Sequence, residues 1–269
     1  MEIAESYRQF LKSDRWPEWR ALETDQRKGV PPPPPQKPYP EGATLVDLVA
    51  PGDLTIGQIP LIEAIKRRRS RREFTAQPLT LEELSFLLWA TQGIDPDATQ
   101  AFQDWFATKE GTKAISILRT VPSAGARHPF ETYILVQRVG RLESGLYRYL
   151  PVEHKLLFLR GGPGLAEEVA TAFARWVRAS AVVFIWAVVP YRTEWRYSIV
   201  SHKMIAQESG HLCQNLYLAC EAIGAGTCAI GAYDQARVDA ILGVDGEDEL
   251  AIYVAPVGKV TPAAYHFDH

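Results

Sequence analysis

Hydrophobic residues recur at helical spacing in five stretches of the chain. The clearest helix start is Thr80–Glu83, a capping box in which the threonine and the glutamate three residues later satisfy each other's backbone N–H groups, and this helix ends at Gly93. The longest pattern runs from Tyr197 to Ile223. We therefore expect helices from Ile62 into the basic run Lys66–Arg69, over 81–92, over 164–177, over 197–223, and over 235–242 behind a capping Asp234.

Strand patterns occupy the stretches between these helices. Residues 181–188 are apolar at every position, which is typical of a central strand buried on both faces. Residues 145–149 and 155–159 flank a short turn and predict a β-hairpin. Further strands are expected over 132–136, over 227–232 as a second inner strand, and over 250–257. Residues 95–118 are polar and irregular and form a candidate lid or loop.

Helices and strands are therefore interspersed, and the strands are joined by hairpins as well as by crossovers. This order predicts an α+β fold, a sandwich with one sheet covered by helices. The length of 269 residues lies within the range in which such a chain remains a single domain.

The N-terminal stretch has a different composition. Pro31–Pro35, Pro38 and Pro40 favour polyproline II geometry and remove backbone donors. Two interpretations are open: a ligand for a proline-recognising domain, or a stiff arm across the protein's own surface or a partner subunit, which we favour. We divide the chain into an N-terminal extension with this arm, residues 1–60, and a main domain, residues 61–269.

Composition and charge narrow the function. Hydrophobic residues make up 46% and charged residues 23%, as in ordinary globular proteins. The 29 basic and 32 acidic residues give a net charge of −3, so no global field attracts nucleic acid or a membrane surface. No apolar run is long enough for a transmembrane helix. We expect neither nucleic-acid nor membrane binding.

The N-terminus and the cysteines indicate the compartment. Met1–Glu5 is acidic and lacks the apolar core of a secretory signal. Cys213 and Cys220 are seven residues apart on one helix face, and Cys228 makes the number odd, which favours buried thiols over disulfides. We therefore expect a cytoplasmic enzyme, and the sequence predicts no metal site.

Three short segments could provide chemistry. Six of the seven residues from Lys66 to Arg72 are basic, which suits a phosphate monoester, although a solvated basic face, a nuclear-import-like patch or a nucleic-acid contact are alternatives. The small residues of Pro122–Ala126 would let a planar ligand approach the backbone, or would form an ordinary turn. Gly224–Gly231 ends a helix and enters a strand, where backbone amides could approach a ligand.

The order and content of these segments resemble the nitroreductase superfamily, and most closely its SagB-type branch. The resemblance covers roughly residues 58–260. The matching segments are Arg68–Phe74, Leu79–Leu84, Leu88–Gly93, Pro122–Ala126, Gly145–Tyr147, Arg192–Tyr197, Gly210–His211, Gln214–Ala219 and Gly224–Gly231. The resemblance implies a nitroreductase-like sandwich with a mixed, mainly antiparallel sheet.

The resemblance also implies a site for flavin mononucleotide (FMN). Its phosphate would be bound by Arg68, Arg69, Ser70 and Arg72, with Lys259 as a further cation. The backbone amides of Ile230 and Gly231 would lie near flavin N5 and O4. Pro122, Ser123, Ala124 and Gly125 would come from the other subunit and pack beside the isoalloxazine, so the resemblance implies a homodimer with shared sites.

The implied reaction is ping-pong electron or hydride transfer through flavin N5, from NAD(P)H to a nitroaromatic, quinone or similar small-molecule acceptor. The alternatives are a SagB-type dehydrogenase or oxidase that tailors a peptide or small metabolite with oxygen as acceptor, and a non-catalytic flavin-binding or scaffold protein. His128 and Tyr197 are the catalytic candidates.

Two departures from the family pattern concern the substrate. Arg196 stands where azoline oxidases have a lysine beside a tyrosine, and arginine is a poor general base. Arg127 and His128 follow the small-residue loop where the family usually has Leu-Tyr. We hypothesise that this basic pair selects an anionic substrate.

Overall fold

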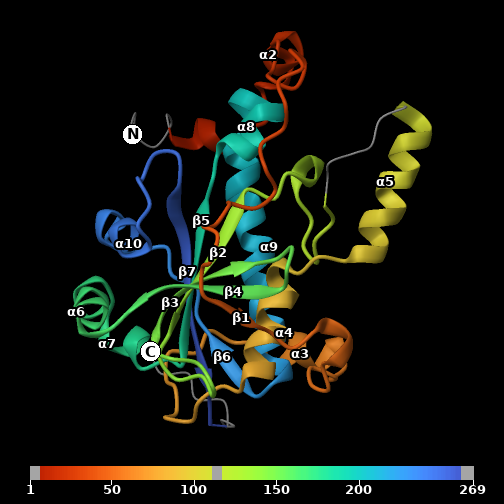
Figure 1. Ribbon diagram of the computed structural model, residues 1–269. Coiled ribbons are helices and arrows are strands. Elements are labelled where there is room, and N and C mark those ends of the chain that lie inside the picture. The colour runs from red at the N-terminus through yellow and green to blue at the C-terminus, as the bar shows by residue number, and fades with distance from the viewer. Residues whose placement is uncertain (1–6, 111–116, 262–269) are drawn as a thin grey trace.

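The computed structural model describes residues 7–110 and 117–261, which form an α+β sandwich around one sheet (Figure 1). In these ranges the sheet has seven strands in the order β1-β4-β3-β2-β5-β7-β6, and neighbouring strands pair antiparallel. The strands are β1 (Leu45–Asp47), β2 (Phe130–Val136), β3 (Gly145–Leu150), β4 (Lys155–Gly161), β5 (Val182–Val188), β6 (Ala225–Thr227) and β7 (Leu250–Lys259). The predicted fold class is confirmed.

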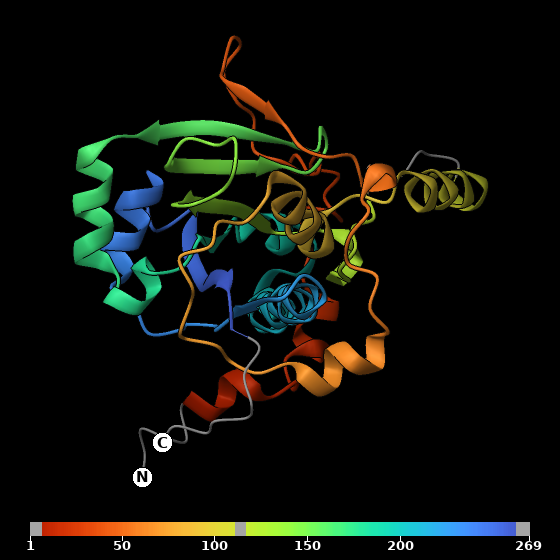
Figure 2. The ribbon, with the colours of Figure 1, turned by 90° about the horizontal axis from the view of Figure 1, so that it is seen from below.

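Helices cover both faces of this sheet. Figures 1 and 2 show α4 and α9 on one side and α6, α7 and α10 on the other. The α-helices are α2 (Trp16–Ala21), α3 (Leu61–Arg67), α4 (Leu81–Gln92), α5 (Pro96–Glu110), α6 (Pro163–Ala172), α7 (Arg175–Arg178), α8 (Tyr191–Tyr197), α9 (Ser201–Ala222) and α10 (Gln235–Leu242). Short 3₁₀ turns are η1 (Gln9–Leu11), η2 (Pro51–Asp53), η3 (Ala124–Ala126) and η4 (Ser198–Val200).

Strand β5 organises both halves of the core. Successive side chains of a strand point to opposite faces, and Phe184 and Trp186 pack in the cluster under α4 and α9, whereas Val183 and Ile185 pack in the cluster under α6 and α10. All seven residues of β5 are buried. The prediction of a central strand buried on both faces is confirmed, as are the β3–β4 hairpin and the Thr80 capping box.

The prediction of an irregular loop over 95–118 is wrong for residues 96–110, which form α5. The Asp95 side chain accepts a hydrogen bond from the Ala98 amide, and Pro96 occupies the first helical position, so both start signals are present. Helix α5 stands away from the body of the molecule (Figures 1 and 2), so polar residues can surround it without the apolar stripe of a packed helix. Residues 111–116 lie outside the described part of the chain, and so do residues 262–269 of the predicted main domain.

Three other predicted elements differ from the structure. The strand expected over 227–232 is the short edge strand β6, not an inner strand, because the chain leaves the sheet after Thr227 and makes only an isolated bridge at Ile230. The helix expected over 164–177 is broken into α6 and α7 by the extended, buried Phe173. The helix expected from Tyr197 begins only at Ser201, because Ser198 has a positive φ of 43°.

The Pro-rich segment lies on the protein's own surface. Arg119 donates a hydrogen bond of 2.7 Å to the Pro35 carbonyl, and Arg148 donates bonds of 2.9 Å to the carbonyls of Lys37 and Pro38. Both guanidiniums are buried. Because proline has no N–H group, the segment offers mostly acceptors, which is what buried arginine donors require.

Two expectations about the whole chain concern thiols and membranes. Cys213, Cys220 and Cys228 are buried and form no disulfide, as expected. Burial raises the pKa of Cys213 to about 12, so this thiol stays protonated. Among the described helices, none has both the length and the hydrophobicity needed to cross a bilayer.

Candidate functional site

The arginine–serine segment follows α3 and is fixed to α9 and β6. The Arg71 amide donates to the Thr227 carbonyl over 2.8 Å. The Ser70 hydroxyl and the Tyr217 hydroxyl hydrogen bond over 3.0 Å, and the Arg68 guanidinium lies 5.4 Å from the centre of the Tyr217 ring. The segment is therefore held by its backbone and by one tyrosine of α9.

The same tyrosine binds the glycine-ended segment. The Ala229 amide donates to the Tyr217 hydroxyl over 2.8 Å. The next amide, that of Ile230, donates to the Val254 carbonyl and is used by the sheet. Gly231 is exposed, and a methyl group placed on it would meet no atom within 4 Å. The backbone of Gly231 is therefore open on the side where a side chain would stand.

The arginine segment retains a positive surplus. Glu221 of α9 is half-buried, and burial raises its pKa, although nearby Arg71, Arg67 and Arg68 and a hydrogen bond from the Arg69 amide act in the opposite direction. Glu221 thus faces three guanidiniums, and Glu63 pairs with Lys66 and Arg67. Arg72 is exposed. Such a surplus suits a doubly charged phosphate.

Lys259 differs from the other predicted phosphate ligands. Its amine forms an ion pair with Glu83 and donates to the Ile223 carbonyl over 2.6 Å, and its side chain is 11% exposed. The charge of Lys259 is thus balanced within the chain. Its role in binding phosphate stays a prediction.

The proline–serine loop is held at the other half of α9. The Ala124 amide donates to Glu208 over 2.7 Å, and the Ser123 hydroxyl accepts from the His128 amide over 2.9 Å. Burial raises the pKa of Glu208 despite its hydrogen bonds to this loop. Gly125 has a positive φ of 58°, which glycine adopts without strain.

The two half-sites are separated along α9. Glu208 and Tyr217 are nine residues apart, which corresponds to about 13 Å of helix. Within one chain, the loop at Pro122–Gly125 and the arginine segment therefore lie against different levels of the same helix.

The two catalytic candidates have different surroundings. His128 is buried, and burial, followed by the charge of Arg119, lowers its pKa well below 6.5, so the imidazole is neutral at physiological pH. Tyr197 lies at the surface end of α8, where its ring stacks on Trp19 with 6.1 Å between ring centres. A methyl group on Gly125 would come within 2.9 Å of the Tyr197 hydroxyl, so Tyr197 borders the loop with its side chain, whereas His128 contacts it through its amide.

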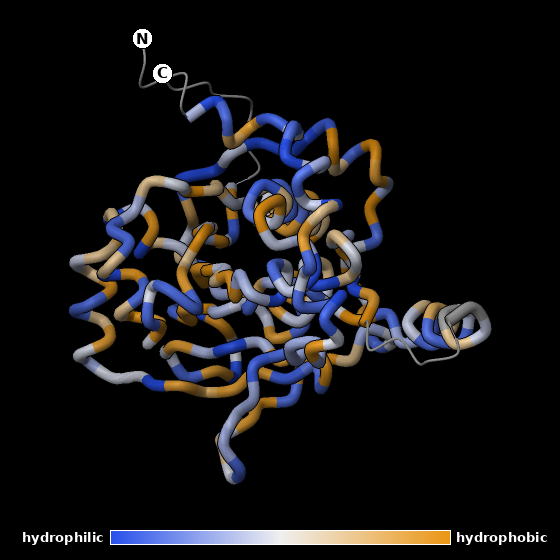
Figure 3. The backbone as a smooth tube through the Cα atoms, turned by 90° about the horizontal axis from the view of Figure 1, so that it is seen from above, coloured by the Kyte–Doolittle hydropathy of each residue, from blue (hydrophilic) through white to orange (hydrophobic). Residues whose placement is uncertain are grey.

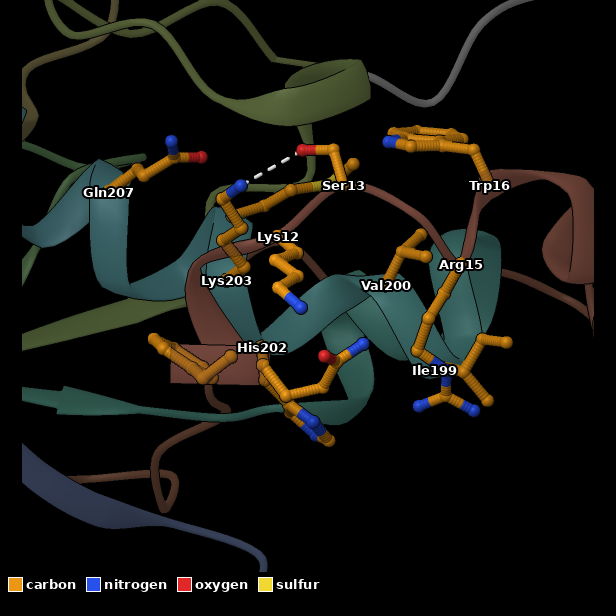
Figure 4. A pocket seen from close by; sticks show the side chains of 12 residues that line it. Lys12, Ser13, Arg15, Trp16, Ile199, Val200, His202, Lys203 and Gln207 are labelled. Atoms are coloured by element: carbon orange, nitrogen blue, oxygen red, sulfur yellow. Dashed lines mark hydrogen bonds between the residues drawn. The ribbon is translucent and has the colours of Figure 1, made fainter. Parts of the chain in front are cut away.

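Several cavities lie outside these half-sites, and two of them border α9. An apolar groove of about 650 Å³ lies between α3, α4, α5 and α9. A smaller cavity of about 320 Å³ lies between the N-terminal segment and the start of α9 (Figure 4). Lys12, Arg15 and Lys203 line the smaller one; Arg15 is paired with Glu18, and no carboxylate of the described residues lines this cavity. Neither cavity is a closed ligand site within one chain.

The residues that organise the half-sites were not predicted. Tyr217 belongs to a matching segment, yet nothing in the sequence shows that its hydroxyl joins Ser70 to Ala229. A usable signal was the helical spacing of Tyr217 and Glu221, which places both on the face that meets the arginines. Glu208 has no comparable signal.

Comparisons with known proteins agree with this fold. A sequence model of the Nitroreductase family matches residues 65–259. A protein of Methanocaldococcus jannaschii with the provisional name nitroreductase is 32% identical over 220 residues, which are 77% of this chain and 98% of that protein. A provisionally named nitroreductase structure from Ralstonia eutropha has a TM-score of 0.63 at 24% identity, and the match covers 88% of this chain and all of that one.

A third comparison is with a solved structure. A structure from Staphylococcus epidermidis, provisionally named NAD(P)H:FMN oxidoreductase, has a TM-score of 0.51 at 13% identity and covers 78% of this chain and 91% of its own. At this identity the likeness shows the fold alone. The family match and the M. jannaschii relative go further, because together they span the arginine segment, the small-residue loop and the glycine-ended segment. The chain belongs to the nitroreductase family.

Proposed function

We propose that the protein is an FMN-dependent oxidoreductase that takes electrons from NAD(P)H and passes them to a nitroaromatic, quinone or similar acceptor. Membership of the nitroreductase family supports oxidoreductase chemistry. The structural observation behind the cofactor is that Tyr217 joins the cationic segment to the glycine-ended segment: Ser70 and the Ala229 amide bind the same hydroxyl. The arginine segment offers cations to a phosphate, and the glycine-ended segment offers exposed backbone to a planar ring.

The residues fit the two ends of FMN. At the phosphate end, Arg68, Arg69, Ser70 and Arg72 offer guanidinium and hydroxyl donors, and the cations of this segment outnumber the carboxylates Glu63 and Glu221 that face them. At the ring end, Gly231 is exposed and has no side chain, so a flat ligand has space to approach its backbone. Ile230 would support the Gly231 amide from behind, because its own N–H and C=O are fixed by Val254.

When bound, FMN would supply hydride transfer at its N5 atom. The amide of Gly231 would donate a hydrogen bond to the ring edge and so favour negative charge there. The arginines fix the phosphate and thereby the position of the ring. No side-chain acid or base is demanded by this scheme. Buried, neutral His128 then supports the loop, since its amide fixes the Ser123 hydroxyl.

A homodimer would complete the site. The separation of the loop and the arginine segment along α9 supports a pocket in which Pro122–Gly125 comes from the partner. Leu61, Ile62 and Ile65 on α3 are 64%, 60% and 56% exposed, next to the apolar groove. Figure 3 shows hydrophobic colour along α3 at the edge of the molecule. Exposed apolar surface of this extent is typical of a subunit interface.

FMN retention tests the proposal. The purified protein should contain FMN, and the double substitution Arg69→Ala and Arg72→Ala should lower both the bound amount and the affinity for added FMN. The matched control is Arg175→Ala with Arg178→Ala, two exposed arginines of α7, which covers the face of the sheet opposite α9. Equal FMN affinity in all three proteins would refute the phosphate assignment, and wild-type protein that neither contains nor binds FMN would refute the function.

A further inference from the structure

A third cavity, of about 620 Å³, lies on the face of the sheet that α6 and α7 cover, opposite α9 (Figure 1). Its floor is formed by the end of β2 and the start of β3, and its wall by the first two turns of α6. Small-molecule pockets in proteins have volumes of about 300–1,000 Å³. The cavity is therefore large enough for a ligand, and it is separate from the half-sites along α9.

Most of the lining is apolar. Leu135 of β2 and Leu165 and Val169 of α6 are buried and belong to the core cluster under α6 and α10. Gly145 of β3 and Ala166 of α6 also line the cavity and add little bulk to it. The space between the sheet and the helix thus offers apolar surface to a hydrocarbon chain or ring.

The polar lining residues gather at one end. The Ser144 hydroxyl donates to the Gln137 carbonyl over 3.1 Å, and the Gln137 amide donates to the hydroxyl of Ser180 over 3.2 Å. Because Ser180 follows Arg178 by two residues, these bonds bring Gln137, Ser144 and the end of α7 together. The cavity therefore has an apolar wall and a polar end.

This polar end is cationic. Arg178 is exposed, and Arg138 donates to the carbonyl of the adjoining Ala179 over 2.6 Å. Within residues 7–110 and 117–261, neither arginine forms an ion pair with a carboxylate, and no Asp or Glu lines the cavity. The planar fork of a guanidinium matches the planar carboxylate group. The charge of the cavity is thus complementary to a carboxylate.

We propose that this cavity binds an amphipathic carboxylate, a molecule with a hydrocarbon chain or ring and one carboxylate group. The hydrocarbon lies between β2 and α6, and the carboxylate accepts hydrogen bonds from Arg178. This site goes beyond the proposed function and does not depend on it, because it lies on the other face of the sheet from α9.

Calorimetry with octanoate on the purified full-length protein tests the proposal. Wild-type protein should bind one octanoate per chain, and the neutral counterpart octanamide about tenfold more weakly, since a hydrogen bond to a charged group is lost. Acetate should not bind measurably, because the hydrocarbon chain supplies most of the affinity.

The substitution Arg178→Gln should weaken octanoate binding by about tenfold and leave octanamide binding unchanged. The matched control is Arg20→Gln, which removes an exposed arginine from the last turn of α2 and should bind octanoate as wild type does.

A second variant tests the apolar wall. Ala166 is an exposed residue of α6 that lines the cavity, so Ala166→Trp should fill the space and abolish octanoate binding without disturbing the core. Ala170→Trp is the control, because Ala170 lies one turn further along α6, is exposed and does not line the cavity. The unfolding midpoint of each variant shows whether it is folded.

Wild-type protein that does not bind octanoate overturns the proposal, and so does octanoate binding that is unaltered in folded Arg178→Gln and Ala166→Trp. Octanoate affinity that falls as the protein concentration rises also overturns it, because a second copy of the chain would then cover the cavity. FMN content, measured on the same samples, reports separately on the proposed function: protein without FMN refutes that function and leaves the octanoate result to decide this inference.

Discussion

At the scale of single residues, Tyr217 has the largest role in the candidate site. Its hydroxyl bonds Ser70 on one side and the Ala229 amide on the other, and its ring lies under Arg68. Three chain segments that are distant in sequence are thereby held at one point. The residue is a positioning residue: it would act on the cofactor through the groups that it holds.

The substitution Tyr217→Phe should weaken FMN binding by about five- to tenfold, because each lost hydrogen bond is worth about 1 kcal/mol. The ring under Arg68 remains, so folding should be retained. Fluorescence titration of the stripped protein with FMN measures the effect. Tyr233→Phe is the control, since it also loses one hydrogen bond, to the Ala251 carbonyl, but lies near α10. Equal FMN affinity in the two variants would contradict the role given to Tyr217.

The sequence predicted which residue types form the candidate site, but it did not predict their contacts. The arginine cluster and the exposed Gly231 follow from local composition and from the family resemblance. The use of Ile230's amide by Val254, and of Lys259's charge by Glu83, depends on segments that meet only in the folded chain. His128 was expected near the substrate as a charged group, and its burial, which neutralises it, is likewise a tertiary effect.

At the scale of elements, the sequence predicted correctly those helices and strands that are determined by neighbouring residues. The apolar run of β5 and the capping box of α4 are set by neighbours in sequence, and both are confirmed. The edge strand β6 and the helix α5 are not determined by neighbouring residues alone. Strand β6 ends near Ala229, whose amide bonds the Tyr217 hydroxyl. Helix α5 extends away from the core, so it does not need the hydrophobic periodicity of a packed helix.

The Pro-rich arm gives a prediction at this scale. Five serines in place of Pro31–Pro35 should destabilise the protein by about 2–5 kcal/mol, because each proline restricts the unfolded chain by about 0.4–1 kcal/mol where its folded geometry is compatible. Urea unfolding measures the change. The folded arm has a fixed geometry because it is docked: the Pro35 carbonyl accepts a hydrogen bond from buried Arg119. An unchanged unfolding midpoint would show that the arm is not docked in solution and would favour a role in binding a proline-recognising domain.

At the scale of the whole molecule, the two half-sites and the exposed apolar surface lead to the same conclusion. Helix α9 holds the loop at Glu208 and the arginine segment at Tyr217, about 13 Å apart. We propose that a pocket built from both takes its loop from a second chain. The apolar residues of α3 and the groove beside them supply a surface on which that chain can pack.

The substitutions Ile62→Asp and Ile65→Asp should therefore convert a dimer into a monomer and release FMN, because two charges would be buried at the interface. Light scattering coupled to size exclusion gives the mass, and the absorbance of the same peak gives the flavin content. Val152→Asp is the matched control, as Val152 is 51% exposed at the turn after β3. A dimer that persists with both aspartates would place the interface elsewhere.

Anaerobic titration of the purified, flavin-containing protein with NADH and NADPH, followed by absorbance, tests most directly whether a nicotinamide nucleotide reduces the flavin. We predict that one of the two bleaches the flavin band stoichiometrically, and that adding a nitroaromatic or quinone restores it. A band that persists with both nicotinamide nucleotides would contradict donor-driven reduction and would favour a dehydrogenase reduced by its own substrate.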